Sequence, residues 1–224
     1  MAMTLEDLIA RFRVLAADKE EPPFWSNEDV ARWLSDGQVQ ACIRGRLLRE
    51  DTRDAVCRIT LEPGRQVYKL HRAVYELLDL RIRPATGGRS RPLALVTREW
   101  LNAEMPHWRD CDRPARFAIQ DENSLRLVGG IEPGDVLHLE CYRLPLAALE
   151  DGGDTPEIHE AHHVALVQWA LFQAFSVPDS DAFDPARASL AEEAFTRYFG
   201  LMPDSDLRRA TRQDVPHHNV AVLP

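Results

Sequence analysis

The fold class is decided by residues 158–177, which read IHEAHHVALVQWALFQAFSV. Apolar residues recur in this stretch at intervals of one helical turn, and small or aromatic residues fill the neighbouring faces. The residues that set this period are Val164, Val167, Leu171 and Phe175. A helix that is apolar nearly all round is covered on most sides by other elements. We therefore expect a helical core built around this stretch.

Three further segments carry helix signals. Residues 4–17 place apolar side chains on one side at helical spacing, which predicts a short amphipathic helix. Ser26 opens an N-capping pattern, and a helical stretch follows it to about residue 50. Asp184-Pro185 is a strong start signal for a last helix, which Gly200 ends.

The chain between these helices changes to the two-residue alternation of β-strands. We expect extended runs at residues 57–61, 67–70, 78–83, 93–96, 117–119, 125–128 and 136–142. The turns at Pro63-Gly64 and Gly87-Gly88 predict hairpins within this block, and Thr97 can cap a short helix that ends before Pro106.

These patterns together predict an α+β fold, with a bundle of about four helices, a β-rich inserted subdomain and an extended C-terminal tail. The expected divisions are N-terminal bundle helices at 1–54, the insertion at 55–146, C-terminal bundle helices at 147–202 and the tail at 203–224. The tail shows no period that could form a core.

Charge argues against a free-standing nucleic-acid binder. The 224 residues carry a formal net charge of -9, whereas such binders normally show a basic patch or stripe. The excess is concentrated at residues 146–200, which hold 10 acidic and 2 basic side chains. Like charge of this kind suits the wall of a channel through which DNA slides, because it prevents phosphate from adhering. Ordinary solubility is the alternative explanation.

No catalytic motif is present in the sequence. The nucleophile elbow Gly-x-Ser-x-Gly and the phosphate-binding glycine loops are absent, so we expect no enzyme activity and no cofactor. The four cysteines form no CxxC pair and are expected to be buried free thiols. The sequence shows no signal peptide or membrane span, which predicts synthesis in a cytoplasm and no membrane partner.

Two alternatives to a structural role follow from particular residues. His159, His162 and His163 could share a helix face and offer imidazoles to a metal ion, as in a metal-dependent hydrolase, although no HExxH motif accompanies them. Residues 26–53 could instead form part of a DNA-binding regulator that uses its arginines on phosphates, but the helical pattern runs through Gly37 without a clear turn. Those arginines are Arg44, Arg46, Arg49 and Arg53.

Several short motifs, taken in their order along the chain, resemble a known family. They are Phe24-Trp25-Ser26 before a long helix, QVYKL at 66–70, YRLPL at 142–146, TPEIHEAHHVALVQWAL at 155–171 and a last helix that ends in Phe199-Gly200. The chain resembles the head-to-tail connector (adaptor) proteins of tailed phages. In that family a Pro-Glu-Ile-Pro stretch followed by Tyr-His commonly opens the buried helix. Here His159 and His162 replace the second proline and the tyrosine.

The resemblance implies a structural virion protein made in the bacterial host cytoplasm and placed in the neck of the particle. Such adaptors form a ring, here expected to hold twelve copies, between the portal protein and a tail or nozzle protein. Genomic DNA passes through the ring without specific binding. A C-terminal segment docks onto the portal, which assigns that contact to Leu207, Arg208, Arg209, Arg212, Val215, His217, Val220 and Val222. No catalytic, metal or cofactor site is implied.

Overall fold

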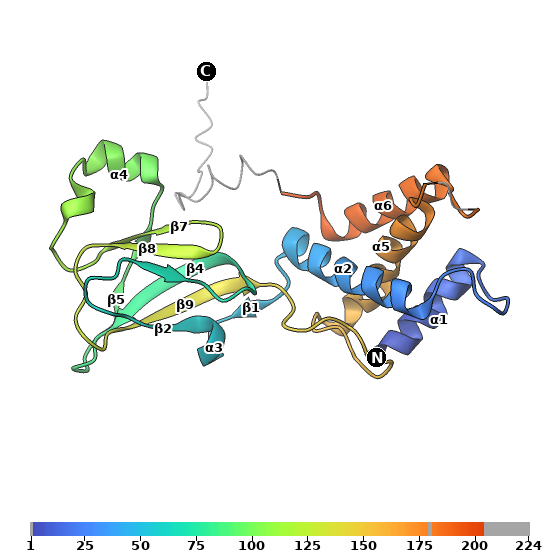
Figure 1. The fold of residues 1–224 in the computed structure, drawn as a ribbon, viewed down its shortest axis with the longest axis horizontal. Helices are drawn as coiled ribbons and strands as arrows, with labels where there is room; N and C mark the ends of the chain where they lie inside the picture. The colour runs from blue at the N-terminus through green and yellow to red at the C-terminus, as the bar shows by residue number, and fades with distance from the viewer. Residues whose placement is uncertain (1, 179–180, 204–224) are drawn as a thin grey trace, which may run out of the picture. The chain divides into compact units, whose positions relative to one another are not determined.

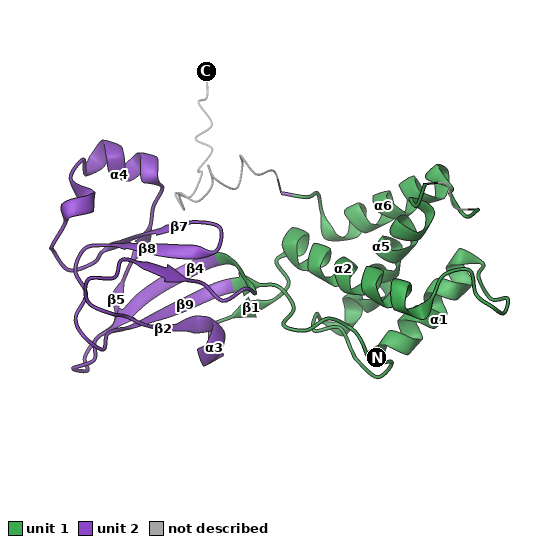
Figure 2. Cartoon of the chain, in the orientation of Figure 1, with its two compact units in different colours: residues 1–50, 73–76, 142–202 green, residues 51–72, 77–141, 203–224 purple. Residues whose placement is uncertain are grey.

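The computed structural model describes residues 2–178 and 181–203. Within them the fold is a mixed α+β structure with six α-helices and two β-sheets (Figure 1). The chain divides into two compact units (Figure 2). The helical unit comprises residues 1–50, 73–76 and 142–202, and the β unit comprises residues 51–72 and 77–141.

Four helices of the helical unit contribute to one hydrophobic core. They are α1 (Leu5–Ala16), α2 (Asn27–Gly45), α5 (His163–Phe175) and α6 (Pro185–Phe199). A short 3-10 turn, η2 (Glu160–His162), leads into α5. The core takes buried side chains from every one of these helices, and α5 contributes seven buried apolar residues to it, as its nearly continuous apolar surface predicted.

The predicted capping residues Ser26 and Asp184 begin their helices as expected, and Thr4, for which no cap was predicted, also caps its helix. Thr4 Oγ1 accepts a hydrogen bond from Asp7 N, and Asp7 in return accepts from Thr4 N, which is a complete capping box. Ser26 caps α2 through Asp29 N, and Asp184 accepts from two backbone amides at the start of α6. These side chains satisfy amides that a helix start leaves without intrahelical partners.

The prediction that the second helix continues to about residue 50 is wrong. It ends at Gly45, because Arg46 adopts the left-handed conformation with φ 51°, and its N–H bonds back to the carbonyl of Cys42. The chain then enters the short strand β1 (Arg49–Glu50). Helical periodicity alone did not show this stop, since arginine is not a residue that usually marks it.

Gly37 lies inside α2 where that helix crosses α5. A Cβ built on Gly37 would lie 3.0 Å from Cβ of Trp169, so even a methyl group there would require Trp169 to shift. Glycine in a helix interior is unfavourable by roughly 1 kcal/mol relative to alanine. The close approach of the two helices explains why it is present.

The acidic Gly-rich segment at residues 151–154 forms an ordered turn that holds the first helix. Leu5 N donates to Asp154 O at 2.7 Å, and Glu6 N donates to Gly152 O at 3.0 Å. Two first-turn amides of α1 therefore find their partners about 150 residues away along the chain.

One sheet has the strand order β1-β9-β4-β5, and β2 also pairs with β9. Its further strands are β2 (Arg58–Thr60), β4 (Val74–Arg83), β5 (Arg91–Pro92) and β9 (Val136–Arg143). The four-residue helix α3 (Asp54–Cys57) directly precedes β2. The boundary between the two units falls within β4, after Glu76, and within β9, before Tyr142.

The second sheet has the order β3-β8-β7-β6. Its strands are β3 (Val67–Lys69), β8 (Ser124–Val128), β7 (Phe117–Gln120) and β6 (Ala94–Leu95). The helix α4 (Arg98–Glu104) begins at the predicted cap Thr97, and the 3-10 turn η1 (Trp108–Asp110) follows it. Side chains from α4, η1, β7 and β8 form a small separate core: Leu101, Trp108, Ile119 and Val128.

The predicted hairpin around Pro63-Gly64 is wrong, because β2 pairs with β9 in the first sheet and β3 pairs with β8 in the second. The predicted hairpin around Gly87-Gly88 does form, between β4 and β5. Both glycines have positive φ, of 81° and 113°, which glycine adopts without strain. The apolar run after β5 leaves this hairpin and pairs with β7 in parallel as β6.

Candidate interaction surfaces

His163, the last histidine of the sequence cluster, is a satisfied residue of the helical core. It is buried, its Nδ1 accepts from Met3 N at 3.2 Å, and its Nε2 lies 2.9 Å from the carbonyl oxygen of Ile158. A neutral ring with its proton on Nε2 satisfies both contacts. His163 therefore anchors the chain before α1 to the start of α5 and has no ring nitrogen left for a metal.

The other two histidines have different partners at the protein surface. His159 Nδ1 accepts from Ala161 N at 3.2 Å, which caps η2. His162 Nδ1 lies 3.1 Å from Tyr198 Oη on α6. Across the residues that the structure describes, no group of three or more His, Cys, Asp or Glu side chains is arranged to hold a metal ion. The three histidines thus make structural contacts around the start of α5.

Arg44, one of the arginines considered for DNA phosphates, faces the protein itself. Its Nη1 donates to Thr196 Oγ1 at 2.9 Å. Its guanidinium lies over the rings of Trp169 and Phe195, with Cζ 5.3 and 5.2 Å from the two centroids. Burial lowers the pKa of Arg44, and the nearby carboxylate of Glu192 opposes that shift. Arg44 links α2 to α5 and α6.

The remaining arginines of this segment do not form a helix-borne row. Arg46 lies beyond the end of α2 and binds both carboxylate oxygens of Glu76, at 2.9 and 3.0 Å. Arg49 lies in β1, and Arg53 precedes α3. The helix itself runs through residues 27–45 without a turn, as the sequence pattern indicated, so this segment has no helix-turn-helix geometry.

A buried ionic network joins β1, the end of β9 and the segment before η2. Arg143 Nε lies 3.2 Å from Glu50 Oε2, and Arg143 Nη1 lies 2.7 Å from Glu157 Oε2. The side chains of Arg143 and Glu50 are only 7% and 8% exposed. Arg143 Nη1 also donates to the carbonyl of Leu144. Buried charges persist only when they are paired and hydrogen-bonded in this way.

Glu157 extends this network to the helical core. Its other carboxylate oxygen accepts from Leu146 N at 2.5 Å, and its own N–H donates to Oε1 of the buried Gln38 on α2 at 2.5 Å. Through Arg143 and Glu157 the network therefore links α2, β1, the end of β9 and the segment before η2. The network fixes the start of the α5 segment against α2.

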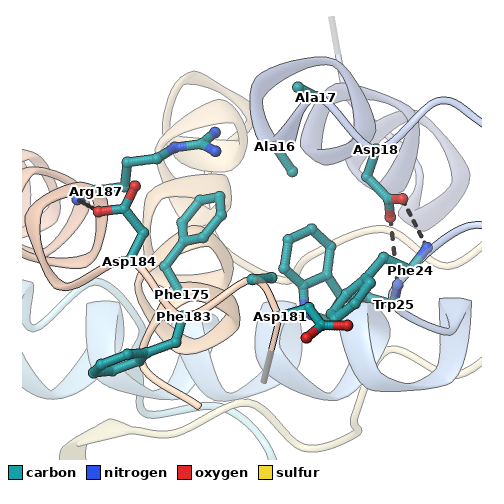
Figure 3. A pocket seen from close by; sticks show the side chains of 11 residues that line it. Ala16, Ala17, Asp18, Phe24, Trp25, Phe175, Asp181, Phe183, Asp184 and Arg187 are labelled. Atoms are coloured by element: carbon teal, nitrogen blue, oxygen red, sulfur yellow. Dashed lines mark hydrogen bonds between the residues drawn. The ribbon is translucent and has the colours of Figure 1, made fainter. Parts of the chain in front are cut away.

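A groove of about 320 Å³ opens at one end of the helical unit, where α1 and α5 end and α6 begins (Figure 3). The rings of Trp25 and Phe175 form its floor, since they are 8% and 3% exposed and meet edge to face with centroids 5.5 Å apart. Phe24 and Phe183 stand at its rim, 52% and 49% exposed, and Asp181 is exposed beside them. We call this site the aromatic groove.

Two charged residues of the aromatic groove are already engaged. Asp18 forms an ion pair with Arg13, and its two oxygens accept from Phe24 N at 2.7 Å and from Trp25 N at 3.4 Å (Figure 3). Arg187 donates through Nη2 to the carbonyl of Leu15 at 2.9 Å. Its Cζ lies 3.9 Å from the ring centroid of Phe175. The groove walls are therefore held in place by internal contacts.

A second exposed apolar surface lies where α5 begins and α6 ends. Tyr198 Oη donates to the carbonyl of Ala161 at 3.1 Å, which joins these two ends. The exposed apolar side chains of this surface are Val164, Tyr198, Leu201 and Met202. Exposed apolar side chains that gather in one place are typical of protein contact sites. We call this surface the α5–α6 patch.

The portal-docking residues expected from the sequence, Leu207 to Val222, lie outside the described residues. All four cysteines are free thiols; Cys42, Cys57 and Cys141 are buried as predicted, whereas Cys111 is only partly buried.

Comparison with known proteins identifies the family. The sequence model of the SU10 adaptor proteins matches residues 3–218, nearly the whole chain. The chain belongs to the SU10 adaptor protein family. A comparison with curated proteins found no match.

As an SU10 adaptor protein, the chain is a structural component of a phage particle, and its partners are other virion proteins. This confirms the resemblance to phage head-tail adaptors. Within the described ranges no helix has both the length and the apolar character needed to cross a membrane. The family match also includes the first part of the expected docking segment, up to residue 218.

Two motifs that carried the resemblance of this SU10 adaptor protein meet in the buried network. Arg143 comes from YRLPL at 142–146, and Glu157 comes from the TPEI that begins the next motif. Sequence reasoning did not identify Glu50 or Gln38 as their partners. The sequence did contain a signal for such a network. The alternation along β9 puts Arg143 on the same buried face as Cys141, and a buried arginine requires a carboxylate.

Proposed function

We propose that this phage structural protein is a head-to-tail adaptor that forms a ring of twelve copies between the portal protein and a tail or nozzle protein. In this role it lines the channel through which genomic DNA passes without specific binding. The observation that carries the proposal is the match of the SU10 adaptor family to residues 3–218. The histidines considered for a metal ion, and Arg44 and Arg46, which were considered for DNA phosphates, contact other residues of the protein itself. These structural contacts are consistent with an adaptor role.

The distribution of charge supports a place beside DNA. Residues 146–200 carry 10 acidic and 2 basic side chains, and Glu192 and Glu193 are exposed on α6. A wall of this sign repels phosphate and lets a duplex slide. Replacing Glu192 and Glu193 with arginine should leave assembly intact and slow DNA release from particles.

Exposed apolar surface supports assembly into a ring. The α5–α6 patch and Leu190 on α6 leave apolar side chains in water, which contacts with neighbouring subunits would cover. Head-to-tail contacts of this kind close into a ring when the rotation between copies permits it.

The tail is proposed as the portal-docking segment, through the residues named from the sequence between Leu207 and Val222. Its start is rich in arginine and its end in valine, so it offers both ion pairs and apolar contacts.

Mass photometry of the protein mixed with purified portal tests the proposal. The full chain should give a large discrete complex, and a chain that ends at Met202 should give none. A matched full-length variant, Arg208→Glu with Arg209→Glu and Arg212→Glu, separates loss of the contact from loss of the fold. If neither the full chain nor the variant binds portal, the adaptor role at the portal is excluded.

A further inference from the structure

The aromatic groove has the chemistry of a site for a planar cation. Aromatic faces attract a guanidinium, and a carboxylate beside them adds an ion pair. The groove already holds one such contact, with Arg187 Cζ 3.9 Å from the centroid of Phe175. Phe24 and Phe183 offer two more ring surfaces at its rim.

The carboxylates of the groove differ in what they can still bind. Asp18 is paired with Arg13 and accepts two amides, and Asp184 accepts the amides of Ala186 and Arg187. Asp181 is exposed, and within the described part of the chain no ion pair engages its side chain. An incoming cation would therefore find Asp181 as its carboxylate partner.

The tail contains a matching segment, Leu207-Arg208-Arg209-Ala210-Thr211-Arg212. The helix α6 begins at the groove and ends at Phe199, and its 15 residues span roughly 22 Å. Eight extended residues, from Gly200 to Leu207, reach about 26 Å. A tail that returns along α6 therefore brings Arg208 and Arg209 back to the groove.

We propose that the aromatic groove binds the tail of its own chain, with Arg208 or Arg209 stacked on Phe24 or Phe183 and paired with Asp181. The tether favours this occupant, because a short linker gives an effective concentration on the order of millimolar, which a separate copy does not match at ordinary concentrations. The inference goes beyond the adaptor role and does not depend on the portal, which can be absent from the test.

A photo-cross-linking experiment on the full-length chain tests this contact. The photoreactive residue p-benzoylphenylalanine is placed at Phe183, and the free protein is irradiated without portal. The monomer band is then digested with a protease that cuts before aspartate, and the fragments are identified by mass spectrometry. We expect a cross-link from position 183 to the fragment of residues 206–213. The same probe at the exposed Ala10 of α1 should not give this product.

A variant distinguishes a specific contact from chance proximity of the tail. Arg208→Ala with Arg209→Ala should lower the yield of the cross-link at least about fivefold, because it removes the cation–π contacts. Asp181→Lys should lower it as well, while the thermal midpoint stays unchanged because the side chain is exposed.

Three results would overturn the proposal. The first is a cross-link yield that is unchanged in the arginine variant. The second is a cross-link found only in a dimer band, which would assign the groove to a second copy. The third is a cross-linked product that contains no tail fragment. Failure of portal binding in the separate assembly test would leave the cross-link unaffected, so the two ideas fail independently.

Discussion

Arg143 and Glu157 form a 2.7 Å ion pair that joins the end of the long strand β9 to the start of the α5 segment. Arg143 also binds Glu50, so one guanidinium holds two carboxylates that are far apart in the sequence. Because Arg143 and Glu50 are almost completely buried, neither can be solvated by water when its partner is lost.

Replacing Arg143 with alanine should therefore lower the free energy of unfolding by about 3 kcal/mol, since it leaves buried carboxylates without a partner. Urea denaturation followed by tryptophan fluorescence measures this loss. The control is Arg46→Ala, which breaks the exposed pair with Glu76 and should cost less than about 1 kcal/mol. Equal losses in the two variants would show that the buried network has no special role in stability.

The close approach of α2 and α5 makes Gly37 sensitive to added volume. Gly37→Leu should lower the free energy of unfolding by about 2 kcal/mol, because its side chain would displace Trp169. Ala10→Leu adds a similar side chain to the exposed face of α1 and should change stability by less than about 0.5 kcal/mol. A Gly37→Leu variant as stable as the parent would contradict the packing described for these helices.

Cys42 should make stability depend on pH in the alkaline range. Burial raises the pKa of its thiol from 9.0 to about 12. The folded state favours the protonated thiol, so this contribution is complete below pH 9 and is lost as pH rises toward 12. The stability of the parent relative to Cys42→Ala should fall by up to about 1.4 kcal/mol per pH unit above pH 9.5. Parallel stability curves for the two proteins would refute this effect.

Asp154 should control the start of the first helix. Backbone hydrogen bonds from Glu150 and Asp151 lower the pKa of its carboxyl below the usual 3.8. The stabilisation is therefore present above pH 3.8 and is lost as pH falls through the lowered pKa. Asp154→Ala should speed hydrogen exchange at the amides of Leu5 and Glu6 about fivefold, as measured by NMR.

The amide of Asp29 is the internal reference for that experiment, because it is capped by Ser26 and is independent of the turn. If the amides of α1 and α2 respond equally to Asp154→Ala, the effect is global and the local role of Asp154 is disproved.

Local sequence signals predicted the helices that begin with a side-chain cap. Thr4, Ser26 and Asp184 each satisfy amides within three residues of themselves, so the information lies in one short stretch of chain. The same holds for the turn at Gly87-Gly88, where two glycines supply the positive φ that the hairpin between β4 and β5 requires.

Features that depend on distant partners were not predicted. Two-residue alternation identifies a strand but not its neighbour, which is why β2 and β3 were paired with each other although they lie in different sheets. The buried position of Arg143 indicated that a carboxylate must pair with it. No local pattern identified that carboxylate as Glu50, which lies 93 residues away along the chain. The aromatic groove likewise combines the loop after α1 with residues near the start of α6, which no local pattern connects.

The discontinuity of the helical unit also affects how the protein is made. Residues 1–50 leave the ribosome first, yet α1 and α2 pack against α5, which lies beyond residue 160. Translation of residues 51–141 alone takes about 5 to 20 s at typical rates. During that interval the faces of α1 and α2 that pack against α5 have no partner, so the nascent chain is open to chaperones and to aggregation until its last helices emerge.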